Sequence, residues 1–279
     1  MKKRFFLLFQ YILPQQLLSA MMGRLAESRS VKLKNFMISR FCKRYNVDLS
    51  EANSSNLADY PSFNSFFIRE LKPGSRPIVP GDDTIASPAD GTIAQIGSIN
   101  QGQLLQAKGF HFTLDGLLAQ AAEASSFLDG KFATLYLAPH NYHRVHMPLA
   151  GKLVKTIYVP GKLFSVNAIT SASVPNLYAR NERLIAFFET QNGLMAVILV
   201  GAMIVGSIQT VWMTHPIKSK KPIVTTYADG MSLSKGQDLG HFKMGSTVVL
   251  LFNNHVSWEP RLTPNTPVKT GQLLGKILK

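Results

Sequence analysis

Cysteine and long apolar runs are scarce in this sequence of 279 residues, and their scarcity excludes several classes of protein. Cys42 is the only cysteine, so an internal disulfide is impossible, which is typical of proteins from a reducing compartment. We assign this residue to the core as a small apolar side chain, without a functional role. Charged residues make up only 16% of the chain and hydrophobic ones 46%, which favours a globular protein over a disordered one.

Acidic residues are almost missing from the first 45 residues. This segment holds ten lysines or arginines and a single acid, Glu27, although the whole chain has a net charge of only +14. A concentrated basic segment favours an anionic partner, either a lipid surface or a nucleic acid. Aromatic and aliphatic residues follow the basic start at residues 5–13, and we find no nucleic-acid recognition motif. We therefore expect an anionic membrane surface as partner, and no nucleic acid.

The apolar stretch at residues 5–13 is too short for a membrane span, which needs about 20 apolar residues. It also resembles the start of a secretory signal. Pro14 and three glutamines interrupt it, however, and no clear cleavage site of small residues follows. We therefore interpret the stretch as part of the mature protein.

A basic amphipathic helix is predicted over residues 31–45. Beside an aromatic-rich segment, such a helix favours a position in the membrane interface. The alternative is an ordinary helix that packs on the core and leaves its basic face in solvent. At 100° per residue, the apolar face would carry Leu33, Met37, Ile38, Phe41, Cys42 and Tyr45, and the basic face Lys32, Arg40, Lys43 and Arg44.

Beyond residue 78 the sequence changes to short apolar runs separated by Gly, Pro and Asp-Gly, which is typical of a β-rich domain. We therefore expect an α+β fold, with N-terminal membrane-associated helices in residues 1–75. A mainly antiparallel, β-sandwich or barrel-like catalytic core would follow in residues 76–279. The apolar stretch 194–208 is interpreted as two adjacent buried strands. Helices are predicted around 63–68 and over 114–124, and strands over 91–96, 132–138, 151–159, 184–189, 194–200, 204–212 and 247–252.

Three histidines, His140, His143 and His146, lie within seven residues. On a helix this spacing would place them on one face and indicate a zinc site. Prolines at 139 and 148 and the β-rich surroundings favour an extended segment instead, in which the middle histidine faces away from the other two. Three ligands would not converge, so we expect no metal. One or two of these histidines are better suited to act as acid or base, since their pKa is near neutral.

Two further short stretches contain chemically useful side chains. Asp90 precedes Gly91, and Asp-Gly taken alone is a hairpin-turn signal. Ser246 follows Gly245 directly before an apolar strand, which taken alone also indicates a turn. The G-x-S-x-G pattern of many serine hydrolases is absent from the chain.

Taken together and in order, these stretches resemble the bacterial phosphatidylserine decarboxylases over the whole length of the chain. Any single tripeptide would be weak evidence, but so many in the same order are highly specific. The matching motifs are YILP at 11–14, FFIR at 66–69, PADG at 88–91, YHRVHMP at 142–148, LFSVN at 163–167, RNER at 180–183, VGA at 200–202, GSI at 206–208 and GST at 245–247.

The resemblance implies a proenzyme that cuts itself between Gly245 and Ser246 into a β chain, 1–245, and an α chain, 246–279. Ser246 would attack the carbonyl of Gly245, with His146 as base and Asp90 fixing the tautomer of the histidine. Elimination and hydrolysis would then turn Ser246 into a covalent pyruvoyl cofactor. Met244 stands where the family usually has Leu, a change that conserves volume.

The resemblance also implies the reaction. The pyruvoyl group would form a Schiff base with phosphatidylserine and accept electrons as CO2 leaves, giving phosphatidylethanolamine. His143 would return a proton to the substrate, and we assign no role to His140. Phe164, Ser165 and Asn167 match a family motif and are candidates for the substrate pocket, although a turn between strands explains them equally well.

The implied partners are phosphatidylserine and an anionic membrane surface. A lipid substrate places the protein as a peripheral protein on the cytoplasmic face of the inner membrane. The two cleavage products would form a heterodimer, and further dimerisation is expected by family analogy alone. Two alternatives remain on the residues: a serine esterase using Ser246, His146 and Asp90, and a membrane-bound β module without activity. Both predict a chain that stays intact.

Overall fold

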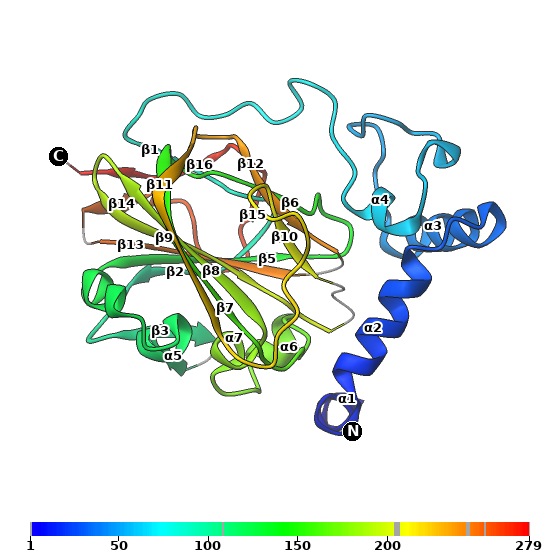
Figure 1. Ribbon diagram of the computed structural model, residues 1–279, viewed down its shortest axis with the longest axis horizontal. Coiled ribbons are helices and arrows are strands. Elements are labelled where there is room, and N and C mark those ends of the chain that lie inside the picture. Colours follow the sequence, from blue (N-terminus) through cyan, green and yellow to red (C-terminus); the bar gives the residue numbers. More distant parts are fainter. Residues whose placement is uncertain (1, 108, 204–206, 244–245, 254, 279) are drawn as a thin grey trace.

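The computed structural model describes residues 2–107, 109–203, 207–243, 246–253 and 255–278. Helices at the N-terminus lie to one side of a body built mainly from strands (Figure 1). The helices are α1 (Lys2–Ile12), α2 (Gln15–Ala26), α3 (Val31–Tyr45), η1 (Leu57–Asp59), α4 (Phe63–Phe67), α5 (Leu114–Leu118), η2 (Ala122–Phe127), α6 (Ala168–Ser171) and α7 (Leu177–Arg180).

The strands are mostly short, as the frequent Gly and Pro residues predict. They are β1 (Thr84–Ala86), β2 (Gly91–Ser98), β3 (Gln103–Ala107), β4 (Phe110–Thr113), β5 (Lys131–Leu137), β6 (Arg144–His146), β7 (Gly151–Val159), β8 (Arg183–Thr190), β9 (Gly193–Val200), β10 (Ile208–Thr210), β11 (Ile223–Leu233), β12 (Asp238–Phe242), β13 (Ser246–Phe252), β14 (Val256–Trp258), β15 (Pro267–Val268) and β16 (Leu273–Ile277).

An eight-stranded antiparallel sheet organises the body, in the order β11-β7-β8-β9-β13-β5-β2-β15. Two three-stranded sheets, β1-β16-β14 and β10-β12-β6, lie on one side of it, and α5, α6 and α7 lie on the other (Figure 1). The expected α+β class with a mainly antiparallel core is confirmed. Its sheets are layered like a sandwich, and no barrel closes among the described strands.

Both faces of the large sheet are buried, which explains the unbroken apolar run of β13. Val248 and Leu250 face the cluster shared with the small sheets, whereas Val249 and Leu251 face the cluster shared with the helices. This alternation follows from the two-residue period of a strand. A side chain on β13 therefore points either to the small sheets or to the helices, according to its parity.

Helix α3 begins and ends where it was predicted, but its apolar face packs on protein. The Phe41 ring lies 5.2 Å from that of Phe63 on α4, and Ile38 is fully buried in the same cluster. Lys34 is also buried, and its Nζ donates to the Leu57 carbonyl at 3.1 Å. The aromatic residues of α4 thus cover part of the apolar face, as the alternative of a packed helix predicts, whereas contact of α3 with a membrane stays a prediction.

Two other expectations need correction. The helix predicted over 114–124 divides into α5 and η2, because Ala119 and Gln120 adopt left-handed conformations, with φ of 56° and 60°. The apolar stretch 194–208 does not form two adjacent strands of one sheet. It supplies β9 to the large sheet and the first residue of β10 to a small one, and residues 204–206 lie outside the described part.

No helix in the described part of the chain is by itself long and apolar enough to cross a membrane. Residues 5–12 of α1 together with α2 pass such a test by length and composition, but the two helices meet at 87°. Their large exposed apolar side chains are Phe5, Leu8, Phe9, Tyr11, Ile12, Leu17, Met21 and Leu25.

Candidate active site

Ser246 is the first residue of β13, at the centre of the large sheet. It lies opposite Leu137 of β5, and from Thr247 onward the strand also pairs with β9. The residue is completely buried, and its Oγ has no hydrogen-bond partner among the described residues. By alternation with Val248, this side chain points toward the small sheet β10-β12-β6. A buried hydroxyl without a partner costs free energy, so this position calls for a functional explanation.

The chain reaches Ser246 from β12, which runs beside the histidine motif. The Phe242 N–H donates to the carbonyl of His143 at 3.2 Å, and the Lys243 N–H donates to that of Ser207 at 3.1 Å. Gly245, the other residue of the expected cleavage site, lies outside the described residues. The backbone just before this bond is therefore anchored next to His143.

His143 is fully enclosed. Its Nδ1 donates to the carbonyl of Asn141 at 2.9 Å, since a carbonyl can only accept. The other nitrogen, Nε2, therefore carries a lone pair, and it has no partner among the described residues. The Phe67 ring lies 4.0 Å from the imidazole, centroid to centroid. Burial lowers the pKa of His143 to about 3, so the ring is neutral at physiological pH.

His146 occupies a different environment three residues later. Its Nδ1 donates to the carbonyl of Gly236 at 2.9 Å, which leaves Nε2 as the basic nitrogen. The Tyr142 hydroxyl donates to this Nε2 at 3.0 Å. The side chain is half-buried and lines a cavity of about 290 Å³ together with Tyr142, Arg76, Arg144 and Asp238. His146 thus borders a space that water can enter, and its Nε2 already accepts from Tyr142.

Asp90 lies near His146 through the backbone, but its carboxylate has other partners. The His146 N–H donates to the carbonyl of Pro88 at 2.7 Å. Both oxygens of Asp90 accept from Arg76, at 2.8 and 2.6 Å, and Oδ1 also accepts from the Thr270 N–H at 2.9 Å. In this structure the tautomer of His146 is therefore set by the Gly236 carbonyl, and the expected role of Asp90 in fixing it is not seen.

Arg76 connects Asp90 to the helical region. Its Nη2 also lies 2.8 Å from the carboxylate of Glu51. Burial alone would lower the pKa of Arg76, but the hydrogen bonds to the two carboxylates outweigh burial and raise it. The guanidinium is therefore a permanent cation that neutralises a buried carboxylate.

The three candidates for the substrate pocket lie apart from this cavity. Asn167 caps α6, with its Oδ1 accepting from the N–H groups of Ile169 and Thr170. Phe164 is buried, and its N–H donates to the Asn181 side chain. Asn167 thus caps a helix and does not lie in a turn between strands, and substrate contact by all three residues stays a prediction.

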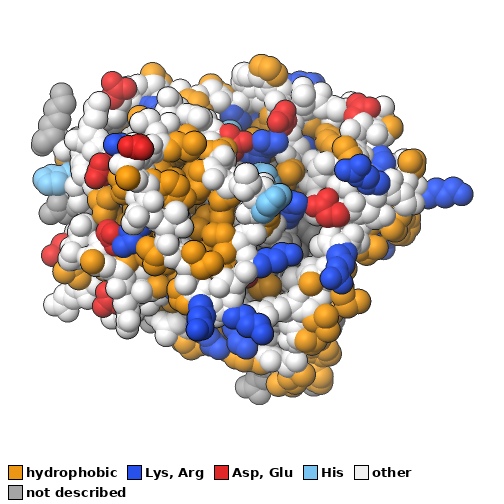
Figure 2. Space-filling view, in the orientation of Figure 1, with side chains coloured by type: hydrophobic (Ala, Val, Ile, Leu, Met, Phe, Trp, Pro, Cys, Tyr) orange, Lys and Arg blue, Asp and Glu red, His pale blue; other side chains and the backbone are white. Residues whose placement is uncertain are grey.

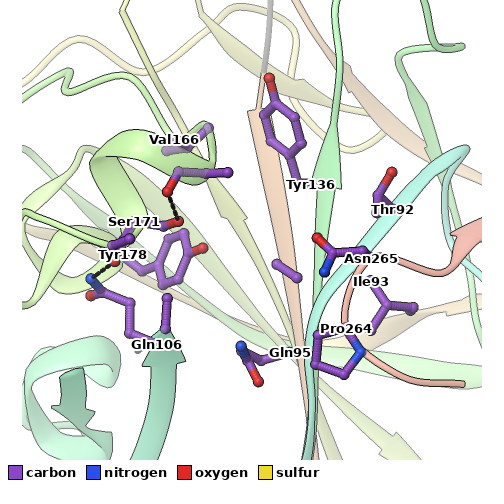
Figure 3. Close-up of a pocket in the computed structure, with 14 residues that line it drawn as sticks. Thr92, Ile93, Gln95, Gln106, Tyr136, Val166, Ser171, Tyr178, Pro264 and Asn265 are labelled. Atoms are coloured by element: carbon purple, nitrogen blue, oxygen red, sulfur yellow. Dashed lines mark hydrogen bonds between the residues drawn. The ribbon is translucent and has the colours of Figure 1, made fainter. Parts of the chain in front are cut away.

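A second cavity, of about 220 Å³, opens on the helical side of the large sheet (Figure 3). Tyr136 and Thr92 lie on one side of it, and Tyr178 and Gln106 lie across from them. Tyr136 precedes Leu137, the partner of Ser246, and so points to the opposite face of the sheet. This cavity therefore does not face the Ser246 side chain.

Arg76, Tyr142 and Gly236 are site residues that sequence reasoning did not single out. Tyr142 could have been found, because it lies within the motif that contains both histidines. Gly236 lies 90 residues from His146 and Arg76 lies 14 residues from Asp90, and only the fold brings these groups together. Among the described residues, no group of three or more His, Cys, Asp or Glu side chains is arranged to hold a metal ion.

The chain matches one protein family along nearly its whole length. The family model described as phosphatidylserine decarboxylase matches residues 63–276, and a second model, described as PSD, matches residues 5–46. A phosphatidylserine decarboxylase proenzyme from Ectopseudomonas mendocina is 50% identical over 282 residues, covering 99% of each chain. Proenzymes of the same name from Marinobacter nauticus and Bordetella pertussis are 47% and 48% identical, covering 99% and 98% of this chain and 99% and 94% of their own.

Replacing Arg76 by methionine should destabilise the protein, because it leaves the buried carboxylate of Asp90 without its cation. We expect the free energy of unfolding to fall by about 3–5 kcal/mol, measured by urea denaturation of the Ser246→Ala chain. The double variant Arg76→Met/Asp90→Asn should recover much of this loss. If the free energy of unfolding of the single variant lies within about 1 kcal/mol of its parent's, the pair with Arg76 does not stabilise the buried Asp90 carboxylate.

Enclosure of His143 should make stability depend on pH. Its folded pKa of about 3 lies below the unfolded value of 6.5, so stability is fully present above pH 6.5 and is lost as pH falls toward 3. Between pH 7.5 and 5.0 the Ser246→Ala chain should lose about 2 kcal/mol more than its His143→Gln derivative. The exposed His255→Gln serves as control. Equal losses in all three chains would contradict the enclosed, neutral state of His143.

Proposed function

This chain belongs to the phosphatidylserine decarboxylase family, and we propose that it is a self-cleaving precursor whose pyruvoyl group is made from Ser246. As a family member it is a carboxy-lyase that converts phosphatidylserine to phosphatidylethanolamine. The name proenzyme, shared by its relatives, agrees with a chain that must be processed. The observation that carries the proposal is the buried Oγ of Ser246, which has no hydrogen-bond partner among the described residues, at the start of the central strand.

The proposed cleavage begins with attack of the Ser246 Oγ on the carbonyl carbon of Gly245. The C–N bond of the peptide breaks as the ester forms, and the hydroxyl proton passes through a base to the freed amine. Loss of a proton from Cα and cleavage of the Cβ–Oγ bond then release residues 1–245 as a carboxylate and leave dehydroalanine at 246. Water replaces the nitrogen of its imine tautomer, which releases ammonia and leaves a pyruvoyl group.

The two histidines are suited to different steps of this chemistry. His146 has its lone pair on Nε2 and faces a cavity, so we propose it as the base for cleavage, as in the Asp90–His146–Ser246 triad. Asp90 completes the proposed triad, although in this structure its carboxylate is bound by Arg76 and its link to His146 runs through the Pro88 carbonyl. His143 has an Nε2 lone pair without a partner among the described residues, and we propose it as the group that returns a proton to the substrate. When formed, the pyruvoyl carbonyl supplies an electron sink for the departure of CO2.

The fold supports a stable complex of the two cleavage products. Segment 246–279 supplies β13, which lies between β5 and β9, and β16, which pairs with β1 and β14. A cut before Ser246 breaks none of these ladders. We propose that the 1–245 and 246–279 chains remain associated through this shared sheet.

We further propose that the enzyme works on the surface of the inner membrane, on its cytoplasmic face. Exposed apolar side chains gather on α1 and α2, and basic side chains lie beside them (Figure 2). Apolar burial and attraction to anionic lipid together favour interfacial binding. In this proposal residues 1–75 form the membrane-associating region and residues 76–279 the catalytic domain.

Intact-mass measurement tests the cleavage directly. The wild-type protein should give two fragments, 1–245 and 246–279, with pyruvoyl in place of serine at the start of the smaller one. The Ser246→Ala chain should stay whole, because it lacks the attacking oxygen. His146→Ala should cleave at least about 100-fold more slowly, the usual contribution of a positioned base. A folded wild-type chain that stays whole would overturn the proposal and leave the serine esterase to be tested.

Polar substitutions on the N-terminal helices test the membrane proposal. Leu8→Ser/Ile12→Ser should weaken sedimentation with phosphatidylglycerol vesicles about tenfold or more, since both side chains are more than half exposed. Self-cleavage should persist. The control pair Leu128→Ser/Leu278→Ser removes apolar groups that are 48% and 51% exposed from outside the N-terminal helices, and it should bind as the wild type does. Equal loss in both pairs would contradict a role for the N-terminal helices.

A further inference from the structure

A cavity of about 570 Å³ lies where the bend between α1 and α2 meets the β core; we call it the elbow cavity. It shares no residue with the cavity beside His146. One wall comes from the two N-terminal helices, and the other from the chain around α7. Its lining residues are Gln10, Tyr11, Leu13, Pro14, Gln15, Gln16, Leu17, Lys162, Phe164 and Arg180.

Two buried glutamines fasten these walls together. The Oε1 of Gln10 accepts from the Ser165 N–H at 2.9 Å, and the Oε1 of Gln15 accepts from the Leu163 N–H at 2.8 Å. Gln15 also donates from Nε2 to the Gln10 carbonyl at 2.5 Å. Both glutamines are less than 8% exposed, although they sit on helices with many exposed apolar residues. These hydrogen bonds therefore fix the N-terminal helices to the core beside the elbow cavity.

Two cations, Lys162 and Arg180, line this cavity. Lys162 and Arg180 are neighbours, because the Lys162 N–H donates to the Arg180 carbonyl at 2.9 Å. The Arg180 guanidinium lies over the rings of Phe164 and Tyr11, at 5.0 and 5.7 Å. Among the described residues, neither side chain forms an ion pair or donates a hydrogen bond. A guanidinium held by its face keeps its N–H groups free at the edge, the geometry that suits phosphate oxygens.

An apolar surface continues from the cavity along the helices. Leu17 and Tyr11 line the cavity and are 60% and 53% exposed, and Ile12 beside them is 70% exposed. Figure 2 shows hydrophobic side chains over the N-terminal helices, with basic side chains next to them. An inorganic anion would leave this apolar surface in water. A lipid would place its phosphate on the cations and its acyl chains on Leu17, Tyr11 and Ile12.

We propose that the elbow cavity binds the phosphodiester of an anionic phospholipid from the bilayer, through Lys162 and Arg180. This inference rests on the proposed function, in which α1 and α2 lie on the membrane. It adds a defined headgroup site, which would hold the N-terminal helices at one depth and one orientation relative to the core. A diffuse basic surface could not do this, because it attracts lipid without fixing a position.

Dihexanoyl phosphatidylglycerol below its micelle concentration is the probe, titrated calorimetrically into the full-length protein. Lys162→Ala/Arg180→Ala should weaken binding about tenfold or more. The control Arg261→Ala/Lys276→Ala removes the same two kinds of charge from the region of β14 and β16, away from α1 and α2 (Figure 1), and should leave binding unchanged. The charge-conserving Lys162→Arg should bind within about threefold of the wild type.

Equal weakening in the elbow variant and the control would overturn the site and leave only diffuse attraction. Inorganic phosphate that binds as tightly as the lipid would overturn the lipid assignment. Intact mass of the same preparations separates this inference from the proposed function. If the wild-type chain stays whole and only the elbow variant binds lipid more weakly, the site is supported and the self-cleavage proposal is overturned. If the wild-type chain is cut and all variants bind lipid equally, the self-cleavage proposal is supported and the site is overturned.

Discussion

Pairing of β13 on both sides is the constraint on which the rest of the site depends. Because β5 and β9 flank this strand, its first residue, Ser246, lies in a fixed register opposite Leu137 and is completely buried. Both faces of the sheet are covered, and side chains alternate between them. The Ser246 side chain therefore points, like that of Val248, toward the small sheet that contains His146. The same pairing holds segment 246–279 in place, so the fold can accept a break in the chain directly before its central strand.

Different enclosure gives two nearby histidines different chemical properties. His143 is sealed under Phe67 and is held neutral by burial, whereas His146 faces a cavity with its Nε2 already oriented by Tyr142. In each ring Nδ1–H donates to a backbone carbonyl, which leaves the lone pair on Nε2. Asp90 is neutralised by Arg76, and this pair joins the helical region to the core through Glu51. Local contacts from Asn141 and Tyr142 and a distant one from Gly236 therefore act together on the two rings.

Apolar runs predicted most of the large sheet, because a strand covered on both faces leaves a continuous signal. The strands expected at 151–159 and 247–252 agree with β7 and β13 to within a residue. β11 was missed, since most of its side chains are exposed and leave no apolar pattern. The helix over 114–124 was too long, because two residues of ordinary type adopt left-handed conformations. Composition does not reveal such a break when neither residue is glycine.

The sequence by itself determined the family, the α+β class, and the motifs that contain Asp90, His143, His146 and Ser246, because these depend on local order along the chain. Tertiary structure decided what each side chain touches. It packs the apolar face of α3 on α4, pairs Asp90 with Arg76, and forms the elbow cavity beside two buried glutamines. Partners separated by many residues meet only when the whole core packs, so no local pattern could have named them.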